Sequence, residues 1–146
     1  MINTSLQHFC NHAKSVGGIS EANVRRLMRD VLPEGIGSRE EADMLIALER
    51  AVPADAAFGD FLIAAVVDFA VWGERPTGRI ERETAAWLAG SLSGRSGPTP
   101  VAARIAVEIV REAQASAENL TAFALAANSW SRQPGAARRP SFALAA

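Results

Sequence analysis

The sequence predicts an all-α fold, a single compact bundle of six to seven helices around a central apolar helix at about residues 56–72. Three observations support this class. Apolar residues recur with helical spacing in one segment after another, capping residues and glycine or proline breaks bound these segments, and no segment alternates as a half-buried strand does. Apolar residues make up 49% of the 146, enough for one packed core.

The first two helices are predicted on either side of a Gly17-Gly18 break. Ser5 is the expected N-cap of the first helix, and Ser20 is the expected N-cap of the second, which ends before Pro33. The first helix buries one face, formed by Leu6, Phe9, Cys10 and Ala13. The second buries another, formed by Val24, Leu27, Met28, Val31 and Leu32.

The third and fourth helices have clear start signals. Ser38 and Glu41 have the spacing of a capping box, and this helix is expected to run to Val52-Pro53. Asp55 can cap the fourth helix, which runs from Ala56 to about Trp72. Because this segment is apolar nearly all round, we expect it at the centre of the bundle.

Three further helices are predicted after two loops, one at Gly73 to Gly78 with Pro76, and one at Ser93 to Pro100 that is rich in glycine, serine and proline. The fifth runs from Ile80 through Leu92, the sixth begins with Thr99-Pro100, and the seventh is centred on 120–127. Residues 1–131 therefore form the predicted domain. Residues 132–146 have three arginines, no acid and no sustained apolar face, so they are expected to form a flexible tail.

Three helix starts share a glycine turn, an apolar anchor and an acidic first turn. They are Gly18-Ile19-Ser20-Glu21-Ala22, Glu34 to Ala42, and Gly78 to Ala85. Local physics alone accounts for this form, because glycine permits the turn and carboxylates favour the positive end of the helix dipole.

The middle turn and the segment Phe61 to Leu92 resemble the bacterial tellurite-resistance TerB-like helical family. The resemblance covers about residues 15–127. It implies an all-helical fold, a role in stress responses, bound divalent cations, and protein partners, often near membranes. It carries Glu34, Glu41 and Asp68 over as acidic, metal-ligating positions. The chain departs from the family in lacking paired aspartates in its turns, and Thr84 stands where a glutamate is expected.

Charge and composition narrow the classes of partner and compartment. The net charge of -1 gives no field to attract nucleic acid, so no nucleic-acid partner is expected. The lone Cys10 and the absence of a signal-like start favour a cytoplasmic protein. The apolar run Phe61 to Trp72, interrupted by Asp68, is shorter than the ~20 residues of a membrane helix. We therefore expect no integral membrane segment, with peripheral association left open.

Two patterns could bind a cation. Asp30, Glu34, Gly35 and Glu41 match positions 1, 5, 6 and 12 of a calcium loop, but Leu32 and Gly37 break the pattern. A capped helix start is the favoured alternative there. His8 and His12 lie one helical turn apart without the glutamate that a hydrolase needs, so exposed histidines are favoured over a metal pair. Cys10 is expected to be a packed thiol.

Asp68 is the one ionisable residue in an otherwise apolar segment. If it is buried, its carboxylate must be paired or hydrogen-bonded. The favoured interpretation is an anchor for the loop at Pro76 to Gly78, or an ion pair with Arg75 or Arg79. A functional acid is the alternative.

No catalytic motif is present, since the chain has no phosphate-binding glycine loop, no nucleophile elbow and no zinc quartet. The predicted function is a non-enzymatic helical interaction module that binds a protein partner or a second copy of itself, without a cofactor. The alternative is a stress-response protein that binds a divalent cation such as calcium.

Overall fold

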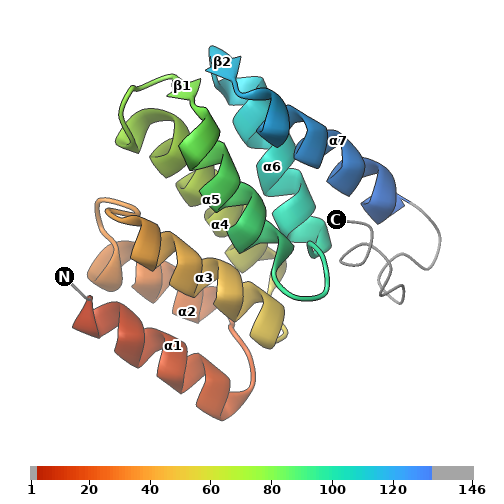
Figure 1. Cartoon of the computed structure of the whole chain (residues 1–146). Helices are drawn as coiled ribbons and strands as arrows, with labels where there is room; N and C mark the ends of the chain where they lie inside the picture. Colours follow the sequence, from red (N-terminus) through yellow and green to blue (C-terminus); the bar gives the residue numbers. More distant parts are fainter. Residues whose placement is uncertain (1–2, 133–146) are drawn as a thin grey trace. The chain divides into compact units, whose positions relative to one another are not determined.

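The protein is all-α, as predicted. The computed structural model describes residues 3–132 and contains seven α-helices over that range. These are α1 Thr4–Val16, α2 Glu21–Arg26, α3 Arg39–Ala51, α4 Ala56–Asp68, α5 Arg82–Ser93, α6 Pro100–Glu112 and α7 Glu118–Arg132 (Figure 1). Single π-helical turns, η1 Leu27–Val31 and η2 Phe69–Gly73, continue α2 and α4. The predicted tail lies outside the described residues from position 133 onward.

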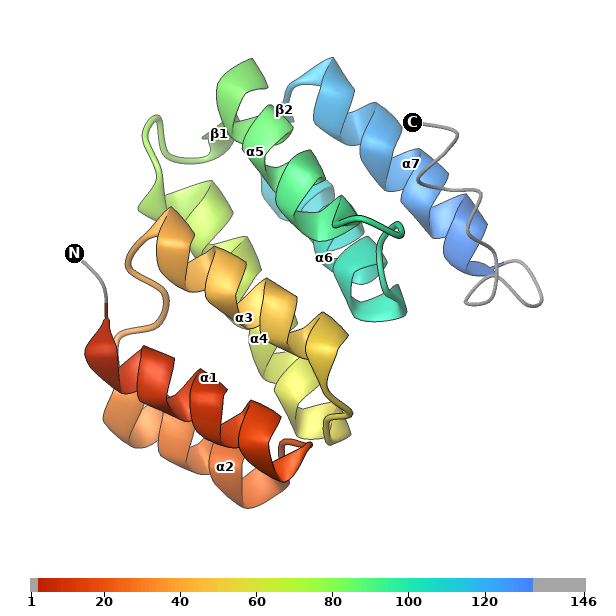
Figure 2. The ribbon, with the colours of Figure 1, turned by 60° about the horizontal axis from the view of Figure 1, so that its bottom comes forward.

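Contacts group the chain into two compact units, Met1–Phe69 and Ala70–Ala146. In the first unit, α1 and α2 with η1 form a helical hairpin; α3 packs on α1, and α4 packs on α2 and α3 (Figure 2). In the second unit, α6 packs against both α5 and α7. Fully buried side chains form the core of each unit, including Leu6, Leu45, Phe58 and Leu62 in the first, and Leu88, Leu92, Ile105 and Ile109 in the second.

Most of the predicted helix caps are confirmed. The side chains of Ser20, Ser38, Asp55 and Thr99 accept hydrogen bonds from first-turn amides. The predicted cap of the first helix is wrong, because Asn3 caps α1 by accepting from the Leu6 amide at 3.0 Å. The Asn3 side chain, two residues before Ser5, provides the acceptor that was expected of Ser5. The helix α1 therefore begins two residues earlier than a helix capped by Ser5 would.

The loops of the first unit are joined by one parallel bridge between Ile19 and Ala54. The Ile19 amide donates to the Pro53 carbonyl at 3.1 Å, and the Asp55 amide donates to the Ile19 carbonyl at 2.9 Å. Because the bridged residues lead directly into α2 and α4, the N-termini of these two helices lie beside each other.

The second unit repeats this arrangement with a two-stranded parallel sheet that the sequence did not predict. β1, Arg79–Ile80, pairs with β2, Ala115–Ser116. The Ala117 amide donates to the Ile80 carbonyl at 2.8 Å, as Asp55 does to Ile19 in the first unit. The strands lead into α5 and α7, whose N-termini are thereby placed together. A two-residue strand is too short for its alternation to be detected in a sequence.

The apolar segment 56–73 is not buried on every side. Asp60, Ala64 and Asp68 lie at i, i+4 and i+8, and all three are exposed. Asp68 is the last residue of α4. The expectation of a buried Asp68 carboxylate is therefore wrong, because this face of the helix meets solvent. By length and composition alone, Ala56–Gly73 is the one stretch of 18 residues in the described chain that could cross a membrane, a test that core helices also pass.

Candidate protein-interaction site

The structure does not assemble the three predicted metal ligands. Glu34 and Asp68 are exposed, and Glu41 is half-buried. Within residues 3–132, no three side chains of histidine, cysteine, aspartate or glutamate are grouped as a metal site requires.

Two of the three acidic residues in the calcium-loop pattern, Asp30 and Glu41, have local partners. Both carboxylate oxygens of Glu41 are engaged, one with the Gly37 amide at 2.7 Å and the other with Asn3 Nδ2 at 3.0 Å. Asp30 lies in the η1 turn and pairs with Arg29, which lowers the pKa of the Asp30 carboxyl through their hydrogen bond. Glu41 thus tethers the start of α1 to the start of α3 in the first unit.

Both predicted histidines are exposed on α1 and line a shallow groove of ≈630 Å³ between α1 and η1. Phe9 forms part of its floor, and the guanidinium of Arg26 lies 5.7 Å from the centre of the Phe9 ring. Arg26 and Phe9 therefore interact with each other across this groove. Cys10 is buried as predicted, and this burial raises the pKa of its thiol.

Exposed large apolar side chains are the next indication of a binding surface. The described residues include four, Val16, Met28, Trp72 and Leu125. The prediction that Met28 lies on the buried face of the second helix is therefore wrong. Trp72 differs from the others in being both 42% exposed and fixed in place, since its indole Nε1 donates to Glu112 Oε2 at 3.0 Å. An exposed tryptophan whose indole is already oriented by a hydrogen bond is typical of an interface anchor, because less side-chain entropy is lost on binding.

Trp72 belongs to the end of the second unit at which the two strands pair. We define the second-unit loop end as Trp72, residues 78–82 and residues 112–117. Gly78 is buried there with φ +79°, and a Cβ at this position would lie 3.1 Å from Gln114 Oε1 and 3.3 Å from the Trp72 ring. Its amide donates to the Val71 carbonyl, and its carbonyl accepts from the Gln114 amide at 2.7 Å. The loop that carries Trp72 is therefore tied by its backbone to β1 and β2.

A small groove of ≈280 Å³ lies at the same end and is formed only by residues of the two paired segments. Its lining is Arg79, Ile80, Glu81, Arg82, Ala115, Ser116 and Ala117. Arg79 and Arg82 are exposed, and no ion pair of either is among the contacts of the described residues. The hydroxyl oxygen of Ser116 exposes less than 1 Å² and has no hydrogen-bond partner there.

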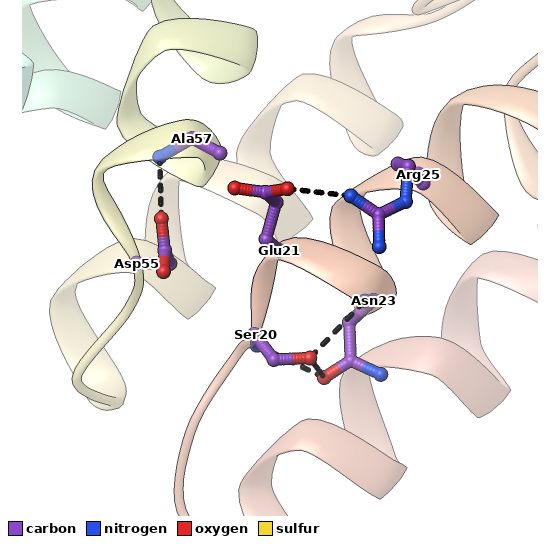
Figure 3. Close-up of polar contacts among 6 residues, drawn as sticks. All are labelled: Ser20, Glu21, Asn23, Arg25, Asp55 and Ala57. Carbon is purple, nitrogen blue, oxygen red and sulfur yellow. Dashed lines mark hydrogen bonds and ion pairs between the residues drawn. The ribbon is translucent and has the colours of Figure 1, made fainter.

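The two pairs of helix N-termini differ in how they are capped. In the first unit, Ser20 and Asn23 form a reciprocal capping box on α2, and the Asp55 carboxylate accepts from the Ala57 amide at 3.1 Å (Figure 3). In the second unit, Glu81 makes no side-chain cap on α5. Ala117, whose carbonyl accepts the first hydrogen bonds of α7, has no side-chain acceptor to offer.

Sequence reasoning missed this end as a site. The signal was present in part, because Gly78-Arg79-Ile80-Glu81 was seen as a repeat of the Gly18-Ile19-Ser20-Glu21 turn. The partner segment of β2 carries no glycine and no capping side chain that would match it to Pro53-Ala54-Asp55. The pairing of the two loops is a tertiary contact, so it produces no periodic pattern of apolar residues in the sequence.

No family model matches the chain, and neither the curated proteins nor the solved structures include a match.

Proposed function

We propose that this protein is a non-enzymatic helical interaction module, and that it binds a protein partner through the second-unit loop end. The observation that carries the proposal is Trp72, a large side chain that is 42% exposed and whose indole is oriented by a hydrogen bond to Glu112. Tryptophan and arginine are the residue types most enriched among the energetic hot spots of protein interfaces.

The surroundings of Trp72 support the same proposal. Two exposed arginines and a small groove belong to the same loop end. Gly78 and Gln114 hold the chain there by backbone hydrogen bonds. An anchor on a rigid support binds with less ordering of loops than one on a free segment.

The resemblance of the middle turn and the segment 61–92 to the bacterial TerB-like family is consistent with a partner-binding role. On that basis we also propose a role in stress responses, and the lone Cys10 supports a proposed cytoplasmic location. The alternative of a divalent-cation protein has no assembled ligand set among residues 3–132, so we do not propose it.

Site-specific photo-crosslinking tests the proposal. A photoreactive amino acid replaces Trp72 in one variant and Leu125, which is 66% exposed on α7, in the control. We expect position 72 to crosslink one protein that position 125 does not. The captured protein is then purified, and its affinity is measured by calorimetry, with Trp72→Ala expected to weaken binding at least about 30-fold, the effect of a hot-spot residue.

Two results would change the conclusion. If the captured species is a second copy of this chain, the module is a homo-oligomer and the loop end is its self-interface. If the purified partner binds Trp72→Ala as tightly as the wild type, the loop end is not the interface.

A further inference from the structure

We propose that His8 and His12 form a binding site for a divalent transition-metal ion, of the zinc, nickel and copper class, on the exposed face of α1. The proposal goes beyond the proposed function and concerns the first unit, so the second-unit loop end plays no part in it. The site has two nitrogen ligands from the protein. It therefore differs from the oxygen-rich calcium pattern at residues 30–41, and it is smaller than the groups of three that are absent from residues 3–132.

The spacing of the two histidines follows from the helix that carries them. α1 runs without a break over Thr4–Val16, so positions 8 and 12 lie one turn apart on the same face, with Cβ atoms about 5–6 Å apart. Two imidazoles at this spacing can reach one metal ion, as in the helical zinc sites whose histidines are four residues apart. The Asn3 cap and Gly17 fix the two ends of α1, so the ligands are held in place before an ion binds.

Both imidazoles are exposed and available. Neither makes a hydrogen bond or ion pair with another residue of the range 3–132. A neutral imidazole that has no such partner keeps a nitrogen lone pair free to coordinate a metal. His8 and His12 also line the same groove of ≈630 Å³ between α1 and η1. This groove leaves room for the remaining ligands of the ion, which are water molecules or groups of a partner.

The charged side chains that face the two histidines across the groove offset each other. They are Arg26 of α2 and Asp30 of η1. Both carboxylate oxygens of Asp30 accept from Arg29, and this hydrogen bonding lowers the pKa of the Asp30 carboxyl. The other helix that packs on α1, α3, contributes no residue to the lining. The groove therefore does not strongly repel a cation, and Asp30 is already engaged and leaves the coordination to the imidazoles.

The ligand type determines the class of metal. Imidazole nitrogen suits zinc, copper and nickel, whereas calcium and magnesium require several oxygen ligands. Cys10 of the same helix is buried on its core side, so no thiolate joins the site. Two imidazoles should therefore bind Cu²⁺ more tightly than Ni²⁺ or Zn²⁺, and should not hold Ca²⁺.

Nickel binding to the full-length, ¹⁵N-labelled protein tests the proposal. Ni²⁺ is titrated by calorimetry at pH 7.5, and its paramagnetic broadening of amide signals is followed by nuclear magnetic resonance. We expect one ion on α1, with broadening centred on residues 5–12 and extending to residues 26–31. Ca²⁺ should not bind there. At pH 5.5 the affinity for Ni²⁺ should fall at least about tenfold, because protons compete for the imidazole nitrogens.

Two variants at exposed positions provide the controls. His8→Asn should weaken Ni²⁺ binding at least about tenfold, because one imidazole remains and chelation is lost. The exchange of two neighbours, Gln7→His with His8→Gln, keeps the composition and charge of the chain. It places the histidines five residues apart and about 140° apart around the helix, so this protein should bind as weakly as His8→Asn.

Stability gives a second measurement. Ni²⁺ should raise the urea midpoint of the wild type and not that of the exchanged protein, because the chelating spacing exists only in the folded helix. Equal midpoints of the two proteins without metal would show that the exchange leaves the fold intact. If the exchanged protein binds Ni²⁺ as tightly as the wild type does, or if broadening is centred outside residues 5–12, the proposal is wrong.

Discussion

The indole Nε1 of Trp72 donates a hydrogen bond of 3.0 Å to Oε2 of Glu112, forty residues further along the chain. This contact orients the exposed large apolar side chain described at the second-unit loop end. Because the pair is exposed, its contribution to stability is small and its main effect is on geometry.

A double-mutant cycle measures this pair. We expect Trp72→Phe and Glu112→Ala to be coupled by about 0.5–1 kcal/mol in urea denaturation, since each change removes the same hydrogen bond. Strictly additive effects of the two substitutions would show that the indole is not held by Glu112 in solution.

The cap of α1 distinguishes the observed helix start from the predicted one. Asn3→Ala should lower the free energy of unfolding by about 1–2 kcal/mol, because it removes both the cap and the hydrogen bond to Glu41. Ser5→Ala is the matched control and should leave stability unchanged or slightly higher, since Ser5 is exposed inside the helix and alanine favours helix. The reverse order of the two midpoints would restore Ser5 as the cap.

Asp68 should tolerate substitution. Its side chain is exposed at the end of α4, and the loop that it was expected to anchor is held by the Gly78 amide on the Val71 carbonyl. We expect Asp68→Asn and Asp68→Ala each to change stability by less than about 0.5 kcal/mol in thermal or chemical unfolding. A loss of 2 kcal/mol or more with alanine would mean that the carboxylate is buried and paired after all.

Helix starts were well predicted because caps are local. Ser20, Ser38, Asp55 and Thr99 each act on an amide two or three residues away, and a sequence displays that spacing directly. The environment of Asp68 was mispredicted because hydropathy shows how apolar a helix is and not which of its sides a neighbour covers. Asp60, Ala64 and Asp68, spaced by four residues, lie on the exposed side of the helix. The apolar residues around them made this side difficult to recognise from the sequence.

The candidate site was harder to predict than the helices. The pairing of β1 with β2 joins segments more than thirty residues apart through two-residue strands. Trp72 also ends an apolar run, a place typical of core or rim aromatics, and the sequence does not decide between the two. Only the tertiary structure shows that α4 has ended by then, and that Trp72 sits on the η2 turn with its ring partly in solvent.

Cys10 gives a test of burial through pH. Burial raises the pKa of its thiol, with Lys14 opposing the shift, so the folded state keeps the thiol proton more strongly than the unfolded state does. Stability from this group is complete below the ordinary cysteine range near pH 8.5 and should fall as the pH rises beyond it. Urea midpoints between pH 7.5 and 10 should therefore decline less steeply for Cys10→Ala than for the wild type. Identical slopes would mean that the thiol is not shielded.

The most direct test of the account is the stability of Ala117→Asp, because Ala117 lies at the start of α7, where its carbonyl accepts the first hydrogen bonds and its side chain offers no cap. Urea denaturation should show a gain of about 0.5–2 kcal/mol over the wild type, the range of an added N-cap. Ala122→Asp, at an exposed position inside α7, is the control and should show no gain. If Ala117→Asp is no more stable than the wild type, Ala117 is not at the N-cap position of α7, and the second-unit loop end is not arranged as described.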